Sequence, residues 1–174
     1  FLKPTAEALK LEKRFDKMGE DLRRFCYYDM MMKSPRADEV VMKMWGMDLP
    51  GVPQWQKFIL KALYPVVRAF SIKVLNVTPE GASDGLYKSK EVFKEVDELL
   101  KDGRQYLLNT AEPTYIDISF AALASILALP ENIAGKALNE ESKPTLDMGS
   151  ADYQKACKDF RKTPAGKFVL KMYK

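Results

Sequence analysis

The side chains that could do chemistry in this 174-residue chain are few in kind. The sequence contains no histidine, which excludes Ser-His and Cys-His nucleophile pairs, imidazole general bases and His-containing metal sites. The two cysteines, Cys26 and Cys157, are too few for a disulfide framework or a four-thiolate zinc site. We therefore predict no catalytic residue and no metal site in this chain.

Both thiols have a plain structural interpretation. Cys26 lies inside a predicted helix, away from the helix N-terminus, so nothing in the sequence activates it, and a buried inert cysteine is expected. Cys157 has cationic neighbours at 155, 158 and 161 that could lower its pKa. We nevertheless expect Cys157 to be an incidental thiol as well.

A group of aromatic and thioether side chains gives the first candidate binding site. Tyr27, Tyr28 and Met31 lie close together on one predicted helix, and such side chains suit a pocket for an apolar ligand. Arg24 could bind a carboxylate through its planar guanidinium. The alternatives are core or interdomain packing for the first three residues and, for Arg24, a solvated flank shared with Arg23.

The elements that position these residues are predicted to be helices, because apolar side chains recur at steps of three and four along most of the chain. Helix starts are predicted at Thr5, Thr78 and Thr163, and Pro65 is predicted to kink a helix. The predicted helices cover residues 5–32, 36–45, 54–76, 78–100, 114–129, 151–162 and 163–173. With no strand, repeat or second domain in view, residues 1–174 are expected to form one all-α domain.

The sharpest local signal is a capping box at Thr114 and Asp117. The Thr114 side chain can accept from the Asp117 backbone N–H, while the Asp117 carboxylate accepts from the Thr114 N–H. Apolar residues on nearly all sides follow, which is typical of a central buried helix. Loss of this cap is expected to cost about 0.5–2 kcal/mol.

Charge and hydropathy exclude two classes of protein. The net charge of +4 is small and evenly shared between the two halves, so no nucleic-acid interface is predicted. The longest apolar run, 118–129, falls short of the roughly 20 residues that a membrane span needs. The basic stretch 155–174 could meet an acidic partner or anionic lipid, although an ordinary amphipathic helix is favoured. We expect the protein to be intracellular, in the cytosol or in the interior of an organelle.

Three segments carry a resemblance to a known family. Glu91–Ile118 (EVFKEVDELLKDGRQYLLNTAEPTYIDI) resembles the junction of two helices in the C-terminal domain of glutathione transferases. The family pattern is a leucine-rich helix, Tyr-Leu, a short loop, and Ser/Thr-x-x-Asp opening a buried helix. Leu11–Met31 and Pro164–Tyr173 are similar at the level of pattern. Two departures are the loop 109–112, where the family has Gly-Asp, and Pro113, where it has Phe.

The resemblance implies an all-α helical bundle like the C-terminal domain of glutathione transferases. It further implies that Tyr27, Tyr28 and Met31 face a pocket for an electrophilic co-substrate, that Arg24 faces a glutathione carboxylate, and that residues 1–4 are an interdomain linker remnant. In the family, glutathione is bound chiefly by an N-terminal thioredoxin-like domain, and nothing in these residues resembles that domain. Family members commonly form homodimers across the first long helices.

Three functions remain open at this point. The first is glutathione transfer, with enzymatic activity only if a thioredoxin-like domain lies upstream of Phe1. The second is a non-catalytic docking subunit of a larger assembly, which suits the methionine-rich stretch at 30–47. The third is a carrier of a small apolar ligand that uses the aromatic and methionine side chains.

Overall fold

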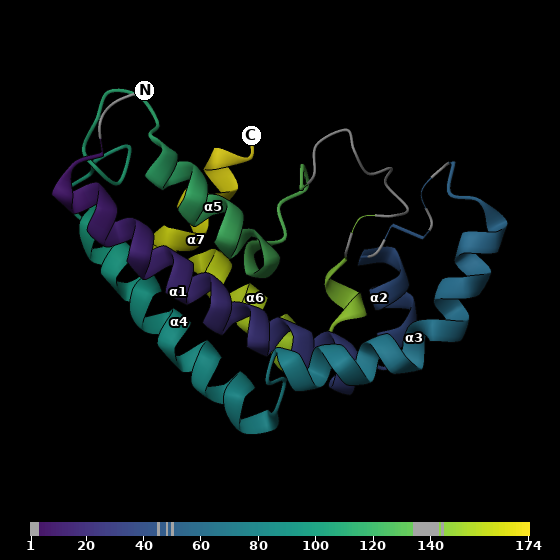
Figure 1. The fold of residues 1–174 in the computed structure, drawn as a ribbon. Coiled ribbons are helices and arrows are strands. Elements are labelled where there is room, and N and C mark those ends of the chain that lie inside the picture. Colours follow the sequence, from purple (N-terminus) through teal and green to yellow (C-terminus); the bar gives the residue numbers. More distant parts are fainter. Residues whose placement is uncertain (1–3, 45, 48, 50, 134–142, 144) are drawn as a thin grey trace.

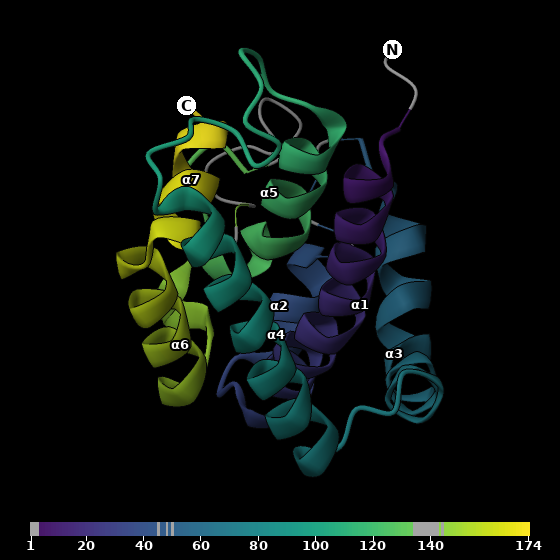
Figure 2. The same ribbon diagram turned by 90° about the vertical axis from the view of Figure 1, so that its left-hand side faces the viewer.

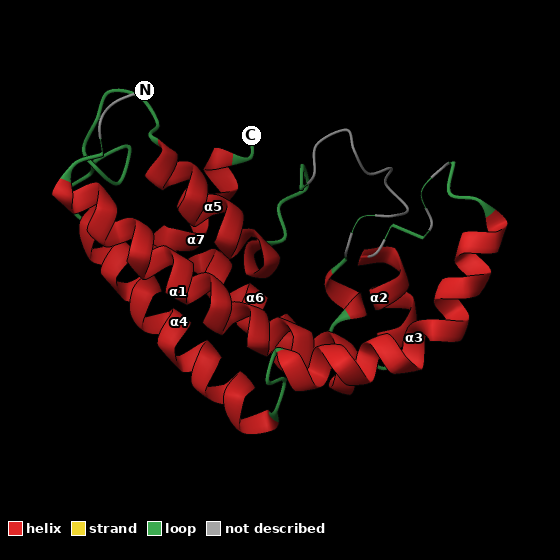
Figure 3. Ribbon diagram, in the orientation of Figure 1, coloured by secondary structure: helices red, strands yellow, loops and turns green. Residues whose placement is uncertain are grey.

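The computed structural model describes residues 4–44, 46–47, 49, 51–133, 143 and 145–174, and it shows helices and connecting loops throughout that part of the chain (Figure 3). The predicted all-α class is therefore confirmed. Residues 1–3 of the predicted linker and position 45 at the predicted end of a helix lie outside the described residues. The α-helices are α1 (Ala6–Tyr28), α2 (Ala37–Met44), α3 (Gln54–Val74), α4 (Pro79–Leu100), α5 (Tyr115–Ala128), α6 (Ala151–Lys162) and α7 (Pro164–Met172).

The helix starts follow the predicted caps. The hydroxyl of Thr5 accepts from Ala8 N–H at 3.1 Å, and Thr78 and Thr163 accept in the same way at the starts of α4 and α7. Each hydroxyl satisfies one of the backbone donors that a helix leaves unpaired in its first turn. These three boundaries are thus fixed by residues adjacent in the sequence.

The core forms where α1, α4, α6 and α7 surround α5 (Figures 1 and 2). Phe120 of α5 is fully buried, and its ring centroid lies 5.0 Å from that of Phe15 in α1. The rings of Phe93 in α4 and Phe168 in α7 lie 6.3 and 6.2 Å from it. The expectation of a central buried helix is confirmed, with Ile118 and Ala122 as its exposed residues.

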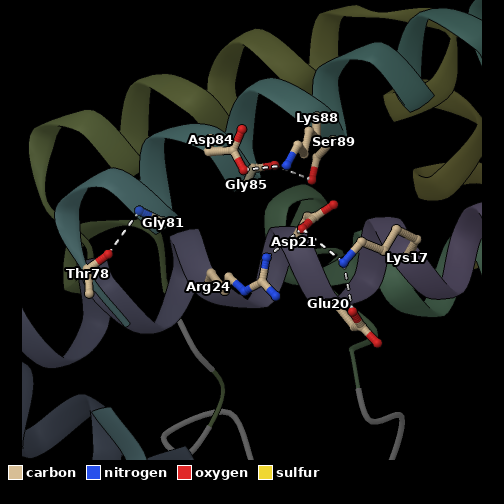
Figure 4. A network of polar contacts seen from close by, with 10 residues as sticks. All are labelled: Lys17, Glu20, Asp21, Arg24, Thr78, Gly81, Asp84, Gly85, Lys88 and Ser89. Carbon is tan, nitrogen blue, oxygen red and sulfur yellow. Dashed lines mark hydrogen bonds and ion pairs between the residues drawn. The ribbon is translucent and has the colours of Figure 1, made fainter. Parts of the chain in front are cut away.

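Helices α1 and α4 lie side by side and touch where a glycine removes the side chain (Figure 4). A Cβ atom added to Gly85 would lie 2.2 Å from the backbone oxygen of Asp21. One turn along α4, the buried Ser89 hydroxyl donates to the Gly85 carbonyl at 2.8 Å. The buried Asp21 carboxylate pairs with Arg24 at 2.8 Å and with Lys17 at 3.7 Å. Backbone contact between the two helices therefore depends on one small residue.

The C-terminal end of α1 continues as a π-helical turn, Asp29–Lys33, before the chain reverses at Ser34. The predicted helix end is confirmed, but the change from α to π geometry had no sequence signal. The buried Asp29 carboxylate accepts from both the backbone N–H and the hydroxyl of Ser150, the N-cap of α6. This contact joins the end of α1 to the start of α6 across 121 positions of the sequence.

Helix α3 lies outside the main core, at the edge of the molecule in both views (Figures 1 and 2). It contacts the rest of the fold through a small separate cluster formed by Met31, Val41 and Tyr64. Arg68 adds a hydrogen bond of 2.6 Å to the backbone oxygen of Met31. The helix is visibly bent along its length in Figure 1 and contains Pro65, the residue predicted to kink it.

The contact at Gly85 yields a stability prediction. Gly85→Ala should lower the free energy of unfolding by about 1–3 kcal/mol, because the new methyl group meets backbone and forces the helices apart. Gly19→Ala is the matched control in α1, since its Cβ would meet only the flexible end of Leu123 at 2.7 Å. Urea denaturation followed by circular dichroism measures both. Equal stability of the two variants would contradict the proposed contact.

Candidate functional site

The predicted site residues on α1 do not gather around one cavity. Tyr28 lines a hollow of about 320 Å³ between α1, α4 and α6. Arg24 and Tyr27 line a smaller hollow of about 150 Å³ beside the C-terminal end of α3. Met31 is buried with Tyr64 in the cluster that supports α3. A role for these residues in binding a ligand remains a prediction.

Arg24 already has a partner. Its guanidinium Nη1 lies 2.8 Å from the carboxylate of Asp21, one turn earlier in α1. Because that carboxylate is buried, loss of Arg24 would leave it with the more distant Lys17, at 3.7 Å, as its partner. A ligand carboxylate at Arg24 would have to compete with this internal pair.

The larger hollow has an apolar floor and a charged rim. Phe25 and Ala156 contribute to the floor and are buried. On the rim, Lys33 Nζ lies 2.7 Å from Asp152 and 5.8 Å from the ring centroid of Tyr28. The hydrogen bond between the pair raises the pKa of Lys33 and lowers that of Asp152, so both remain charged at neutral pH. The rim thus combines this ion pair with two further lysines, Lys90 and Lys155, and with Asp159.

Asp117 occupies the structural position that its sequence context predicts. The capping box with Thr114 is present, and the carboxylate is fully buried. Its Oδ2 accepts from the Thr114 N–H and hydroxyl, each at 2.7 Å. Its Oδ1 accepts from the N–H of Leu107 at 2.7 Å, a contact that the local pattern did not reveal. Asp117 therefore anchors the loop between α4 and α5 as well as capping α5.

The two cysteines are buried thiols. Both Cys26 and Cys157 have no exposed surface. Burial raises the pKa of Cys26 and raises that of Cys157 to about 12, although Arg161 acts in the opposite direction. The expected effect of a neighbouring cation is present at Arg161, but the pKa of Cys157 is still raised, because loss of hydration opposes the thiolate more strongly than Arg161 favours it.

The most unusual surface lies on α3. Seven of its large apolar side chains have exposed fractions between 44% and 75%, and apart from the adjacent pair at 58 and 59 they recur at steps of three to four residues. Among the described residues, only four other large apolar side chains are as open to solvent. We call this set the outer face of α3: Trp55, Phe58, Ile59, Leu63, Val66, Phe70 and Val74.

The outer face reverses the usual orientation of an amphipathic helix. A helix with a broad apolar stripe normally turns it toward the core, and the sequence of α3 predicts such a stripe. In the structure, the side of α3 facing the protein carries Tyr64, its one buried residue, and Arg68, which donates to Met31. The apolar stripe is left facing solvent.

Comparisons with known proteins identify no relative: no family model, curated protein or solved structure matches this chain. The resemblance to glutathione transferases therefore remains a prediction. Among the residues that the structure describes, no helix combines the length and apolar character needed to cross a bilayer. Over the same residues, no grouping of three or more cysteine and acidic side chains could bind a metal ion.

The Asp117 contacts predict a large effect on stability. Asp117→Ala should lower the free energy of unfolding by roughly 2–4 kcal/mol, more than a cap alone, because two buried backbone donors lose their acceptor. Thr114→Ser keeps a hydroxyl at the cap and should stay within about 0.5 kcal/mol of the wild type. Chemical denaturation measures both. An Asp117→Ala loss below about 1 kcal/mol would contradict this role.

The buried thiols predict slow alkylation. In native protein at pH 8, Cys26 and Cys157 should react with a thiol reagent far more slowly than in urea, because both are inaccessible and protonated. Stability should also fall from about pH 8.5 toward pH 12, since unfolded thiols ionise at about 8.5 while the folded thiols keep their protons. Rapid labelling of either thiol in the native protein would contradict the burial.

Proposed function

We propose that this helical domain is a non-catalytic docking module that binds its partner through the outer face of α3. The exposed apolar side chains of that face are the observation that carries the proposal. Contiguous apolar patches of this kind on a protein surface mark sites of association. The folded core of α1, α4, α5, α6 and α7 acts as the support that holds α3 in place.

The size of the outer face supports an interaction surface. At their exposed fractions, the seven side chains present roughly 700 Å², taking about 150–200 Å² for a whole side chain. The largest apolar patch on a typical monomer is about 300–600 Å². A stable interface buries about 800 Å² on each partner. The outer face is therefore large enough to provide most of a specific contact.

The way α3 is attached leaves this face accessible. The helix rests on Met31 and Val41 through Tyr64, and Arg68 holds the backbone of Met31. All these contacts lie on the side opposite the outer face. A partner can consequently cover the outer face without displacing any contact that holds α3 to the fold.

Glutathione transfer, the function that the resemblance implies, remains a prediction, because the family binds glutathione chiefly through a thioredoxin-like domain that nothing in these residues resembles. Carriage of a small apolar ligand also remains a prediction. The hollow of about 320 Å³ beside Tyr28 is a place where such a ligand could bind.

The docking proposal predicts a selective loss of partner capture. Phe58→Ser combined with Phe70→Ser removes two side chains that are 75% and 67% exposed, so stability should change by less than about 1 kcal/mol. The variant is used for affinity capture from an extract of the source organism, with its membranes included. The amount of captured material should fall at least about tenfold, because each aromatic anchor contributes about 1 kcal/mol or more.

The matched control is Tyr87→Ser combined with Ile118→Ser, which removes exposed apolar side chains from α4 and α5 instead. This pair should capture the same material as the wild type. If all three proteins capture equal amounts, docking through α3 is wrong.

A further inference from the structure

The helix that carries the outer face is itself cationic. Within α3 there are four cationic residues and no acidic one. Without these four, the chain has 24 Lys and Arg, equal to its 24 Asp and Glu, although residues 155–174 are also basic, with seven Lys and Arg against one Asp. The four residues are Lys57, Lys61, Arg68 and Lys73.

This distribution argues against a second copy of the chain as the partner. Two copies joined through α3 would bring two helices of charge +4 together, and like charges across an interface oppose association. A partner with negative charge would be attracted instead. The partner therefore has an apolar contact surface combined with anionic groups.

The composition of the outer face separates a lipid surface from an acidic protein. Between Phe58 and Phe70 every exposed residue of α3 is apolar apart from Lys61. Protein interfaces carry about one hydrogen bond per 100–200 Å², so a surface of roughly 700 Å² would normally carry several. Acyl chains require none. Helix α3 also lies at the edge of the molecule in both views, where a large surface can approach it (Figures 1 and 2).

We propose, building on the docking function above, that the partner is an anionic lipid bilayer on which α3 lies in the plane of the interface. The outer face then packs among the acyl chains, and the cations act on the headgroup layer, as in other basic amphipathic helices. Lys61 and Lys73 are exposed and can reach anionic headgroups directly. Lys57 and Arg68, which are half-buried, lie within about one helix diameter, 10 Å, which is comparable to the screening length at physiological salt.

Vesicle binding by the whole chain tests this proposal. The purified protein is sedimented with vesicles of phosphatidylcholine containing about one third phosphatidylserine, and with vesicles of phosphatidylcholine alone, at about 0.1 M salt. We expect at least about tenfold stronger binding to the anionic vesicles and weaker binding as salt is raised, because screening reduces the attraction of cations to the surface.

Two pairs of variants with matched controls locate the binding surface. Phe58→Ser with Phe70→Ser should reduce binding to anionic vesicles about tenfold or more, whereas Tyr87→Ser with Ile118→Ser should leave it within about twofold. Lys61→Glu with Lys73→Glu should have a similar effect to the first pair. The charge control makes the same change at two exposed lysines of α1, Lys10 and Lys13.

The outcomes distinguish this inference from the docking function itself. Binding that depends on the α3 variants and not on their controls supports the bilayer as partner. Binding that is unchanged by the α3 variants overturns it. Failure to bind anionic vesicles, together with an α3-dependent protein partner or an α3-dependent dimer in sedimentation analysis, overturns the lipid proposal and retains docking. If the protein binds neither anionic vesicles nor any partner through α3, both the lipid proposal and the docking proposal are wrong.

Discussion

The burial of α5 is the constraint on which the rest of the fold depends. Phe120 contacts aromatic rings from α1, α4 and α7, so the positions of those helices are set by their common contact with this residue. Asp117 fixes the start of α5 because its carboxylate binds both the cap residue and the loop backbone at Leu107. With the polar start of α5 satisfied, the remainder of the helix can be surrounded by apolar side chains.

Helix α3 lies apart from this core. The main core joins buried residues of α1, α4, α5, α6 and α7, and no residue of α3 belongs to it. Helix α3 is instead held by Tyr64 and Arg68 near Met31, at the π-helical end of α1. The same turn places Asp29 against the start of α6. One irregular segment thus connects the core to both α6 and the outlying helix.

The balance between apolar surface and charge on α3 determines what kind of contact it favours. In the proposed contact, the outer face would supply the area, and the four cations of α3 would favour a partner with negative charge. The segment 155–174 is also basic, with seven Lys and Arg against one Asp, so α3 differs from it in combining cations with exposed large apolar side chains. Both buried thiols belong to the main core, whereas α3 rests on the separate cluster of Met31, Val41 and Tyr64.

The sequence alone determined the features that depend on neighbours along the chain. The helical class follows from apolar spacing, the helix starts follow from Thr5, Thr78 and Thr163, and the buried character of α5 follows from apolar residues on nearly all its sides. The Thr114–Asp117 box was predictable for the same reason, since both partners lie within one helical turn.

Only the tertiary structure decided which surfaces meet. The periodicity of α3 shows that it has an apolar stripe, but burial depends on whether another element is left to cover it, and none of the described helices does so. The separation of Tyr27 from Tyr28 into different hollows, and the contact of Leu107 with Asp117, likewise depend on segments distant in sequence. The local sequence pattern determines which apolar and polar side chains each helix carries, whereas tertiary packing determines which other segments those side chains contact.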